Sequence, residues 1–141
     1  MEKSCGIVLF HSDDFLIIQH SAKSNGSEGH WDFPKGHIED NETELETASR
    51  ELQEETGIGD FTLIDNFKYR ISYNFRKKNQ LVSKEVVFFL AESSTRQVQL
   101  SSEHQNYAWL DFNSAYDRLT YSSAKEVIVK AKTFLENWCK G

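Results

Sequence analysis

The alternation of apolar and polar residues along the chain predicts a series of short strands. Two apolar runs, at residues 5–10 and 15–19, are separated by a short polar stretch, which is typical of a β-hairpin. From residue 67 to residue 75 every second side chain is aromatic or aliphatic, the period of a half-buried strand. Residues 86–91 are continuously apolar, as in a strand covered on both faces, and residues 107–110 predict a further short strand.

Two segments have the periodicity of amphipathic helices instead. Residues 41–56 place apolar side chains on one stripe and acidic side chains on the adjacent one, with Asn41 as the expected N-terminal cap and Gly57 as the expected stop. Near the end of the chain, apolar residues recur at helical spacing over residues 124–138, behind a serine pair at 122–123 that is expected to cap this helix.

The remaining segments predict loops within one domain. Residues 20–30 are polar and predict a loop, and residues 31–37 contain the chain's only proline and predict a rigid loop. Strands and helices in this order predict an α/β protein with a mixed sheet. At 141 residues the chain suffices for one compact domain, which we expect to span residues 1–141.

Composition and charge exclude several functional classes. Sixteen Lys and Arg against 22 Asp and Glu give a net charge of −6, which argues against a general basic surface for nucleic acid. The only cysteines, Cys5 and Cys139, lack CxxC spacing, as expected for a reduced cytoplasmic protein. The apolar run at residues 5–10 is too short for a signal peptide or a membrane span, so we expect no membrane association.

The acidic residues are concentrated in the first predicted helix, where six glutamates lie between Glu42 and Glu55. Such a run is usually a solvated helix face. Glu51, Glu54 and Glu55, however, stand at i, i+3 and i+4, so a helix carries their carboxylates on one side, and such oxygen ligands suit hard divalent cations. We expect these three residues to bind magnesium, with manganese as an alternative. Arg50 can pair with Glu54 or Glu42 and orient a ligand.

The spacing around these glutamates resembles the Nudix box. Gly36 is followed after five residues by Glu42 and after seven more by residues 50–58 (RELQEETGI), which match every fixed position of that box. The resemblance implies the Nudix fold, an α/β/α sandwich with a central mixed β-sheet, and a metal-dependent hydrolase that cleaves a pyrophosphate bond. It also implies that the Gly36 carbonyl joins the metal sphere and that Glu54 and Arg50 serve catalysis.

Segments outside the box are similar to the asymmetrical diadenosine tetraphosphate hydrolases within that family. The similar segments are residues 31–38 (WDFPKGHI), residues 100–110 (LSSEHQNYAWL) and Lys84 before an apolar strand. The resemblance implies that Glu103 lies near the metals as a ligand or as the general base. An exposed loop acid is the alternative interpretation of Glu103.

The same resemblance implies a set of substrate-binding residues. Lys35, His37 and Lys84 would touch the polyphosphate, whose charge magnesium alone does not offset. Tyr73 and Tyr121 resemble the pair that stacks on adenine, a contact that tolerates different bases. For Tyr73, which belongs to the alternating strand, burial in the core is an equal alternative. The expected partner is a small nucleotide, bound by a monomer.

Two departures from the subfamily pattern lie beside the expected substrate groove. Asp32-Phe33 replaces the Thr-Pro common in animal members, and residues 76–83 form a longer segment than the corresponding turn. The expected reaction is hydrolysis of diadenosine tetraphosphate to AMP and ATP. One alternative is a pyrophosphohydrolase that acts on RNA 5′ ends, in which the basic turn at residues 76–78 could hold a short RNA strand. Others are a pyrophosphatase for another nucleoside diphosphate derivative and a non-catalytic nucleotide-binding module.

Overall fold

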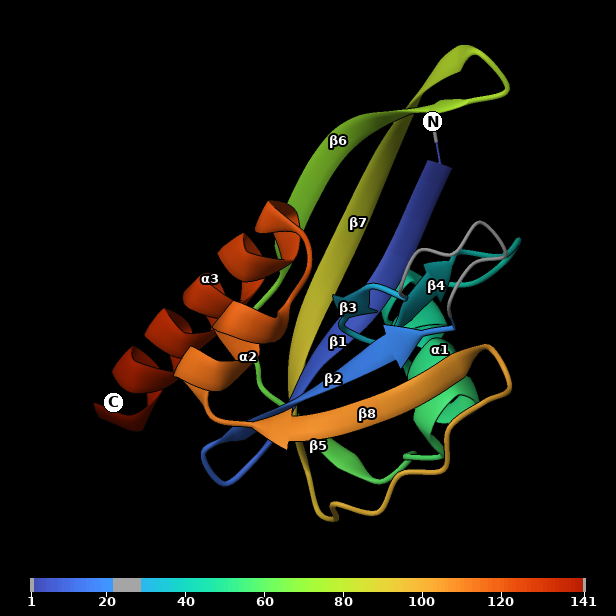
Figure 1. The fold of residues 1–141 in the computed structure, drawn as a ribbon. Coiled ribbons are helices and arrows are strands. Elements are labelled where there is room, and N and C mark those ends of the chain that lie inside the picture. The colour runs from blue at the N-terminus through green and yellow to red at the C-terminus, as the bar shows by residue number, and fades with distance from the viewer. Residues whose placement is uncertain (1, 22–28, 141) are drawn as a thin grey trace.

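The computed structural model describes residues 2–21 and 29–140, with side chains up to residue 138. Its described strands form one mixed sheet with α1 on one face and α2 and α3 on the other (Figure 1), which confirms the expected α/β/α sandwich. The elements in chain order are β1 (Glu2–His11), β2 (Asp14–His20), β3 (Trp31–Asp32), β4 (Lys35–His37), α1 (Glu44–Thr56), β5 (Phe61–Leu63), β6 (Tyr69–Lys77), β7 (Gln80–Ser93), β8 (His104–Leu110), α2 (Phe112–Arg118) and α3 (Ser122–Lys140).

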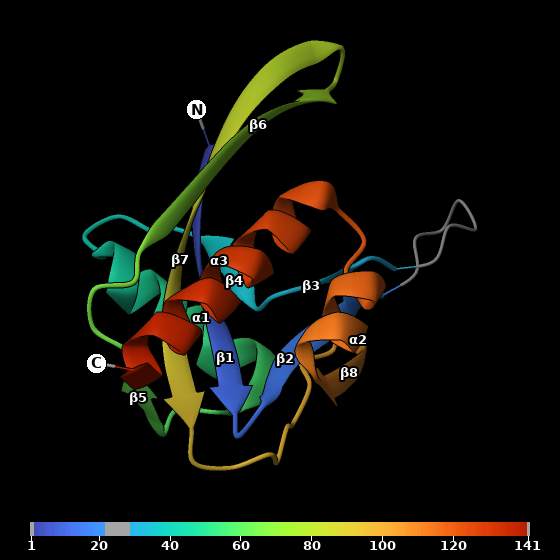
Figure 2. The same cartoon turned by 90° about the vertical axis from the view of Figure 1, so that its left-hand side faces the viewer.

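Strands β1 and β7 form the centre of the sheet and pair in parallel, whereas the other strand pairs are antiparallel. Because successive side chains of a strand point to opposite faces, β1 contributes to two cores. Ile7 and Leu9 pack with Leu52 of α1, and Val8 packs with Ile128 of α3. Figure 2 shows the resulting layers, with α3 and α2 in front of the strands and α1 behind them.

Each predicted strand has a counterpart in the structure, namely β1, β2, β6, β7 and β8. The first two pair as a hairpin with Phe10 opposite Phe15, as expected. Two short strands, β3 and β4, occupy the segment expected to be a rigid loop, and β5 was not expected at all. The polar loop expected at residues 20–30 lies largely outside the described residues. None of the described helices is long and apolar enough to cross a membrane.

The start of α1 differs from the prediction. Thr43, rather than Asn41, is the N-cap: its side chain accepts from the backbone of Glu46, whose carboxylate in turn accepts from the Thr43 backbone. Asn41 has a φ of 69°, in the left-handed region, and lies in the turn before the helix. Gly57 ends α1 as predicted, with a φ of 76° that few other residues adopt.

The start of α3 also corrects the prediction. The helix begins at Ser122, so both serines lie within its first turn instead of preceding it. The backbone carbonyl of Tyr121 accepts from the amides of Ala124 and Lys125. The short helix α2, capped by the Asp111 side chain, was not expected because its seven residues carry too little apolar periodicity.

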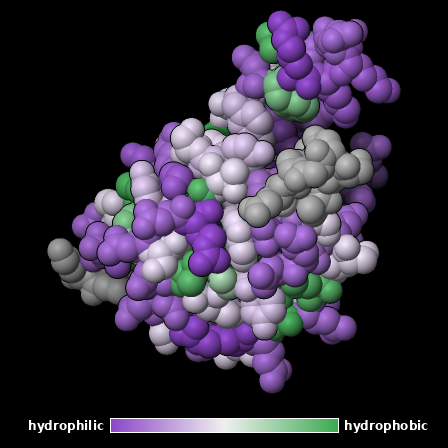
Figure 3. All heavy atoms as spheres, in the orientation of Figure 1, coloured by the Kyte–Doolittle hydropathy of each residue, from purple (hydrophilic) through white to green (hydrophobic). Residues whose placement is uncertain are grey.

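Strands β6 and β7 continue past the body of the sheet as a projecting hairpin (Figures 1 and 2). Its turn residues, Lys78 and Asn79, both have positive φ, the conformation of a tight two-residue hairpin turn. The tip is predominantly hydrophilic in Figure 3, although Leu81 beside it is 66% exposed. The basic turn of the sequence is therefore at the far end of a long ribbon.

Candidate active site

A cavity of about 690 Å³ lies between the β6–β7 hairpin and the beginning of α3. Four of the five predicted substrate-binding residues line it: Lys35, Tyr73, Lys84 and Tyr121. Tyr73 pairs with Lys84 across the hairpin and is 36% exposed, and Tyr121 is 51% exposed. Of the two interpretations of Tyr73, the structure therefore supports the exposed position and not burial in the core.

The two lysines give this cavity a cationic wall. Lys84 is half-buried, and its pKa is lowered chiefly by burial and further by the nearby charge of Lys35. The buried Asp32 carboxylate lies 3.5 Å from the Lys35 ammonium and accepts from the Phe33 amide at 2.7 Å. Asp32 is the only carboxylate among the described lining residues, so the wall has an excess of positive charge that suits an anion such as a phosphate chain.

Strand β4 connects this cavity to the acidic helix. Lys35 faces the cavity, and Gly36 lies against Glu51 of α1, where a β-carbon would be 2.0 Å from Glu51 Cδ. His37 is not brought to the other substrate residues. Its side chain is 65% exposed, with Nε2 3.4 Å from a Glu2 carboxylate oxygen, because β4 pairs with the start of β1 at this point.

Arg50 organises the carboxylates of α1. Its Nε donates to Glu42 Oε2 at 2.6 Å and its Nη1 donates to Glu51 Oε2 at 2.8 Å, so it holds both acids in place. A weaker contact at 3.2 Å reaches Glu54, and Nη2 donates to the His37 carbonyl. The Arg50 hydrogen bonds lower the pKa of Glu42 to about 2, so this partner stays ionised. Arg50 thus contacts Glu42 and Glu54, the two partners that were expected as alternatives.

Glu55 is turned into the protein. Burial is the main reason that its pKa is raised to about 7, an effect to which the neighbouring Glu51 carboxylate adds and which His104 opposes. Its Oε1 lies 3.3 Å from His104 Nε2. Its Oε2 is buried without a hydrogen-bond partner among the described residues. A buried carboxylate oxygen of this kind is costly unless a cation or a donor meets it.

The predicted metal ligands do not converge on one point in this structure. Glu54 is 56% exposed and points toward Arg50, whereas Glu55 is buried beside His104. Glu103 is exposed on the loop before β8, and its backbone carbonyl accepts from the Ser21 amide. Among the residues that the structure describes, no three acidic, histidine or cysteine side chains form a ready-made metal site.

The residues present nevertheless fit a divalent cation. They supply only oxygen donors, the donors that magnesium and manganese prefer in such sites. One of these oxygens, Glu55 Oε2, is buried and has no partner in the described part of the chain, and the missing side chain of Gly36 leaves the space that Glu51 occupies. Glu51, Glu54 and Glu55 are therefore the residues that would hold the ion.

Two functional candidates were not found from the sequence. His104 lies at the start of β8, where it pairs with His20 of the neighbouring strand β2 and contacts Glu55, and no local pattern in the sequence marks it. Asp32 follows Trp31 and lies under the cavity with Lys35. Only its departure from the subfamily pattern marked it in advance.

The site occurs in a chain that is similar to known proteins over nearly its whole length. The family model of the NUDIX domain matches residues 2–131. The chain is 35% identical to the bis(5′-nucleosyl)-tetraphosphatase (asymmetrical) of Sus scrofa, over 94% of this chain and 95% of that protein. It is 30% identical to the Caenorhabditis elegans protein of the same name, over 94% and 96%.

A solved structure agrees with these sequence relationships. The C. elegans Ap4A hydrolase binary complex has a TM-score of 0.81 to this chain at 28% identity. The match covers 97% of this chain and 99% of that one, so the strands and helices that build the site have counterparts throughout.

Proposed function

The chain belongs to the Nudix family, and we propose that it hydrolyses dinucleoside polyphosphates, with diadenosine tetraphosphate cleaved asymmetrically to AMP and ATP. The observation that carries this proposal is the continuity of the site. A cavity with two exposed tyrosine rings and two lysines leads along β4 to the carboxylates of α1. The names of the Sus scrofa and C. elegans relatives support the same substrate class.

The proposed binding mode assigns each wall of the cavity to one part of the substrate. Tyr73 and Tyr121 are proposed to stack on a base, because the exposed Tyr73 of β6 and the exposed Tyr121 directly before α3 line one cavity. Lys35 and Lys84 are proposed to bind the phosphates, because both line the cavity and Lys35 directly precedes Gly36, which lies against Glu51. The reactive phosphate then lies toward α1. His37 lies outside the cavity with an exposed ring, and its proposed role is to meet a phosphate that extends beyond the cavity.

Nudix hydrolases depend on divalent metal ions, and we propose magnesium, with manganese as a substitute, held by Glu51, Glu54 and Glu55 together with the Gly36 carbonyl. A divalent cation offsets the phosphate charge and makes bound water more acidic. Arg50 keeps Glu51 and Glu42 fixed, so less reorganisation is needed when substrate binds. Gly36 leaves room for Glu51 beside the phosphate-binding strand.

The proposed reaction is attack by water on a phosphorus of the chain. The water oxygen forms a new bond to that phosphorus, the bridging oxygen leaves with the other nucleotide, and a carboxylate accepts the proton released by the water. Glu54 and Glu103 are the proposed acceptors, since Glu54 is exposed on α1 and Glu103 is exposed on the loop whose Ser101 amide donates to the Glu55 backbone carbonyl. Arg50 serves Glu54 as an orienting partner.

A substrate panel tests this proposal. Purified protein with magnesium is incubated with diadenosine tetraphosphate, adenosine triphosphate, a nucleotide sugar and a 5′-triphosphorylated RNA, and kcat/KM is measured for each. We expect the dinucleoside polyphosphate to have the highest value. A higher value for the nucleotide sugar or the triphosphate would contradict the assignment.

One observation supports a second candidate, hydrolysis at RNA 5′ ends. Arg76, Lys77 and Lys78 lie at the end of the hairpin whose strand β6 also lines the cavity, so a chain that leaves the cavity along β6 would meet them. Lys77 is partly engaged by Glu2 at 3.5 Å. The RNA arm of the panel measures this activity directly.

We also propose that the chain acts as one cytoplasmic domain and as a monomer. The family match from residue 2 to residue 131 and the two cores that share one sheet support a single domain. Cys5 is buried as a free thiol, which suits a reducing compartment. The molar mass of the purified protein in solution, measured by light scattering, would test whether it is a monomer.

A further inference from the structure

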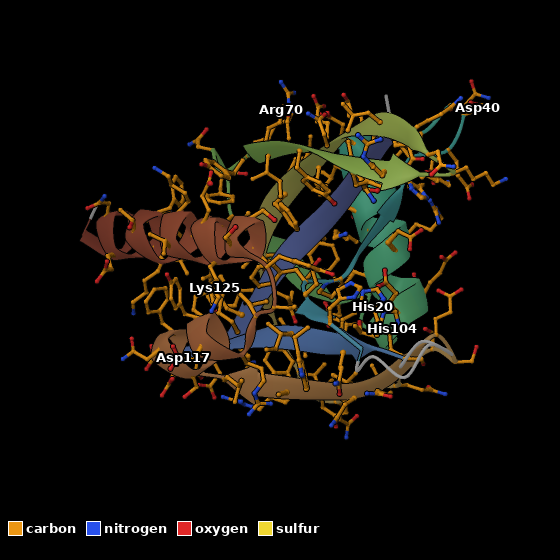
Figure 4. The ribbon with its side chains drawn as sticks, turned by 45° about the horizontal axis from the view of Figure 1, so that its top comes forward. His20, Asp40, Arg70, His104, Asp117 and Lys125 are labelled. Atoms are coloured by element: carbon orange, nitrogen blue, oxygen red, sulfur yellow. The ribbon has the colours of Figure 1, made fainter. Side chains whose placement is uncertain are left out.

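His104 contacts Glu55 but has no role in the reaction proposed above. Both side chains are buried, at 2% and 6% exposure, and they come from β8 and α1, far apart in the sequence. Figure 4 shows His104 beside His20, close to α1. We propose that His104 is a positioning residue that holds Glu55 Oε1, so that Oε2 is the oxygen presented to a bound divalent cation. This inference rests on the proposed function in assigning Glu55 to metal binding.

The two oxygens of Glu55 have different surroundings. Oε1 lies 3.3 Å from His104 Nε2, too poorly aligned for a full hydrogen bond but close enough for electrostatic attraction. Oε2 is buried and has no hydrogen-bond partner among the described residues. A carboxylate held at one oxygen keeps the other in a defined direction, which is how residues behind a metal ligand commonly orient it.

His104 is itself held through its other ring nitrogen. Its Nδ1 lies 3.0 Å from the Ser101 hydroxyl oxygen. When this hydroxyl donates to Nδ1, the neutral imidazole carries its proton on Nε2, the atom that faces Glu55. The Ser101 amide also donates to the Glu55 backbone carbonyl at 3.3 Å. Ser101 therefore fastens the loop before β8 both to His104 and to α1 beside the contact.

The face of the His104 ring is covered as well. The centroid of the His20 ring lies 4.6 Å from that of His104. The His30 ring stacks on His20 with a centroid distance of 4.1 Å, and the Tyr121 ring lies 5.2 Å from His30 between centroids. These rings form a continuous series from the Glu55 contact to the cavity wall. Because side chains in a packed interior have few alternative rotamers, His104 is not free to swing away from Glu55.

Two substitutions separate positioning from simple packing. His104→Gln places an amide nitrogen where Nε2 stands but removes the ring, whereas His104→Phe keeps the ring and removes both nitrogens. A residue that only fills space tolerates Phe better than Gln. A residue that holds Glu55 through Nε2 tolerates Gln better than Phe.

The test measures manganese binding by electron paramagnetic resonance, without substrate or turnover. We expect His104→Phe to raise the Kd for Mn²⁺ roughly tenfold or more and His104→Gln to raise it clearly less. The control is His11→Phe, since His11 also bonds through Nδ1, to the Ser93 carbonyl, and lies against the ring of Trp109, while neither of these partners belongs to α1. This control should bind Mn²⁺ as the wild type does.

Because no substrate is present, these measurements test the role of His104 independently of the proposed substrate. Equal Mn²⁺ affinity of His104→Phe and the wild type, with both folded by circular dichroism, would overturn the inference. If the Phe variant does not fold, His104→Asn takes its place, because its amide reaches only the Nδ1 side, and equal affinities of the Asn and Gln variants would overturn it. Failure of the proposed function would instead appear as tight Mn²⁺ binding without hydrolysis of diadenosine tetraphosphate.

Discussion

Gly36 and Glu51 touch so closely that a β-carbon at position 36 would lie 2.0 Å from the Glu51 carboxylate carbon. The contact joins the strand that carries Lys35 to the helix that carries the carboxylates. A substitution here therefore displaces the end of a flexible side chain and leaves the backbone in place.

For this reason Gly36→Ala is expected to reduce kcat by at least about tenfold while changing the melting temperature little, since only the Glu51 carboxylate has to move. Gly59→Ala is the matched control, because a β-carbon at position 59 meets its nearest neighbour at an ordinary 3.6 Å. Steady-state kinetics and thermal melts of both variants check this. A large loss of stability with unchanged kcat in Gly36→Ala would contradict it.

Arg50→Lys tests the role of the guanidinium in holding the acids. Arg50 donates to Glu42 and Glu51 through separate nitrogens, and an ammonium does not reproduce that geometry. We expect a lower melting temperature, with the larger deficit in EDTA, because magnesium then no longer helps to offset the carboxylates. A melting temperature equal to that of the wild type, both with magnesium and in EDTA, would show that Arg50 does not hold these acids.

The raised pKa of Glu55 predicts how the stability of the metal-free protein depends on pH. Its folded pKa is about 7 against an ordinary 4.5, so the folded state binds the proton more tightly than the unfolded state does. The resulting stability is fully present below pH 4.5 and is lost as the pH rises through 7.

In EDTA, the free energy of unfolding should therefore fall by up to about 3 kcal/mol between pH 5 and pH 8 on account of this group. Glu55→Gln should make that dependence shallower, because the amide does not titrate. Urea unfolding at several pH values measures both proteins. Curves with the same slope for both would show that Glu55 does not titrate in this range.

Tyr121→Ala tests the assignment of the cavity to a base. Loss of a stacking contact of about 1–3 kcal/mol should raise KM for diadenosine tetraphosphate roughly five- to a hundredfold. Tyr107→Ala serves as the control, since Tyr107 is 39% exposed on β8 and does not line the cavity. Equal KM values for the two variants would mean that Tyr121 does not hold the base.

The acidic helix and most of the cavity could be predicted because their signals are local. The i, i+3 and i+4 spacing of Glu51, Glu54 and Glu55 places them on one helix, and Gly57 ends it through its own backbone preference. The alternation over residues 67–75 likewise predicts the strand that carries Tyr73. Each of these conclusions depends on residues a few positions apart.

What could not be predicted depends on contacts between distant segments. The burial of Glu55 beside His104 requires β8 to pair with β2, and the exposure of His37 follows from the pairing of β4 with β1. Asn41 and Thr43 are both suitable caps. Asn41 adopts the left-handed conformation of the preceding turn, and Thr43 is extended and caps the helix. None of these choices leaves a periodic pattern in the sequence.

The central claim is that the protein hydrolyses diadenosine tetraphosphate with the help of the carboxylates of α1, and one measurement tests it. The release of AMP and ATP from diadenosine tetraphosphate is followed with magnesium for the wild type, Glu54→Gln and the surface control Glu136→Gln. Glu54 is 56% exposed, so the substitution should leave the fold intact. We predict equal amounts of AMP and ATP from the wild type and the control, and a rate lower by roughly a hundredfold or more for Glu54→Gln. Two molecules of ADP as the products, or a Glu54→Gln rate near that of the wild type, would contradict it.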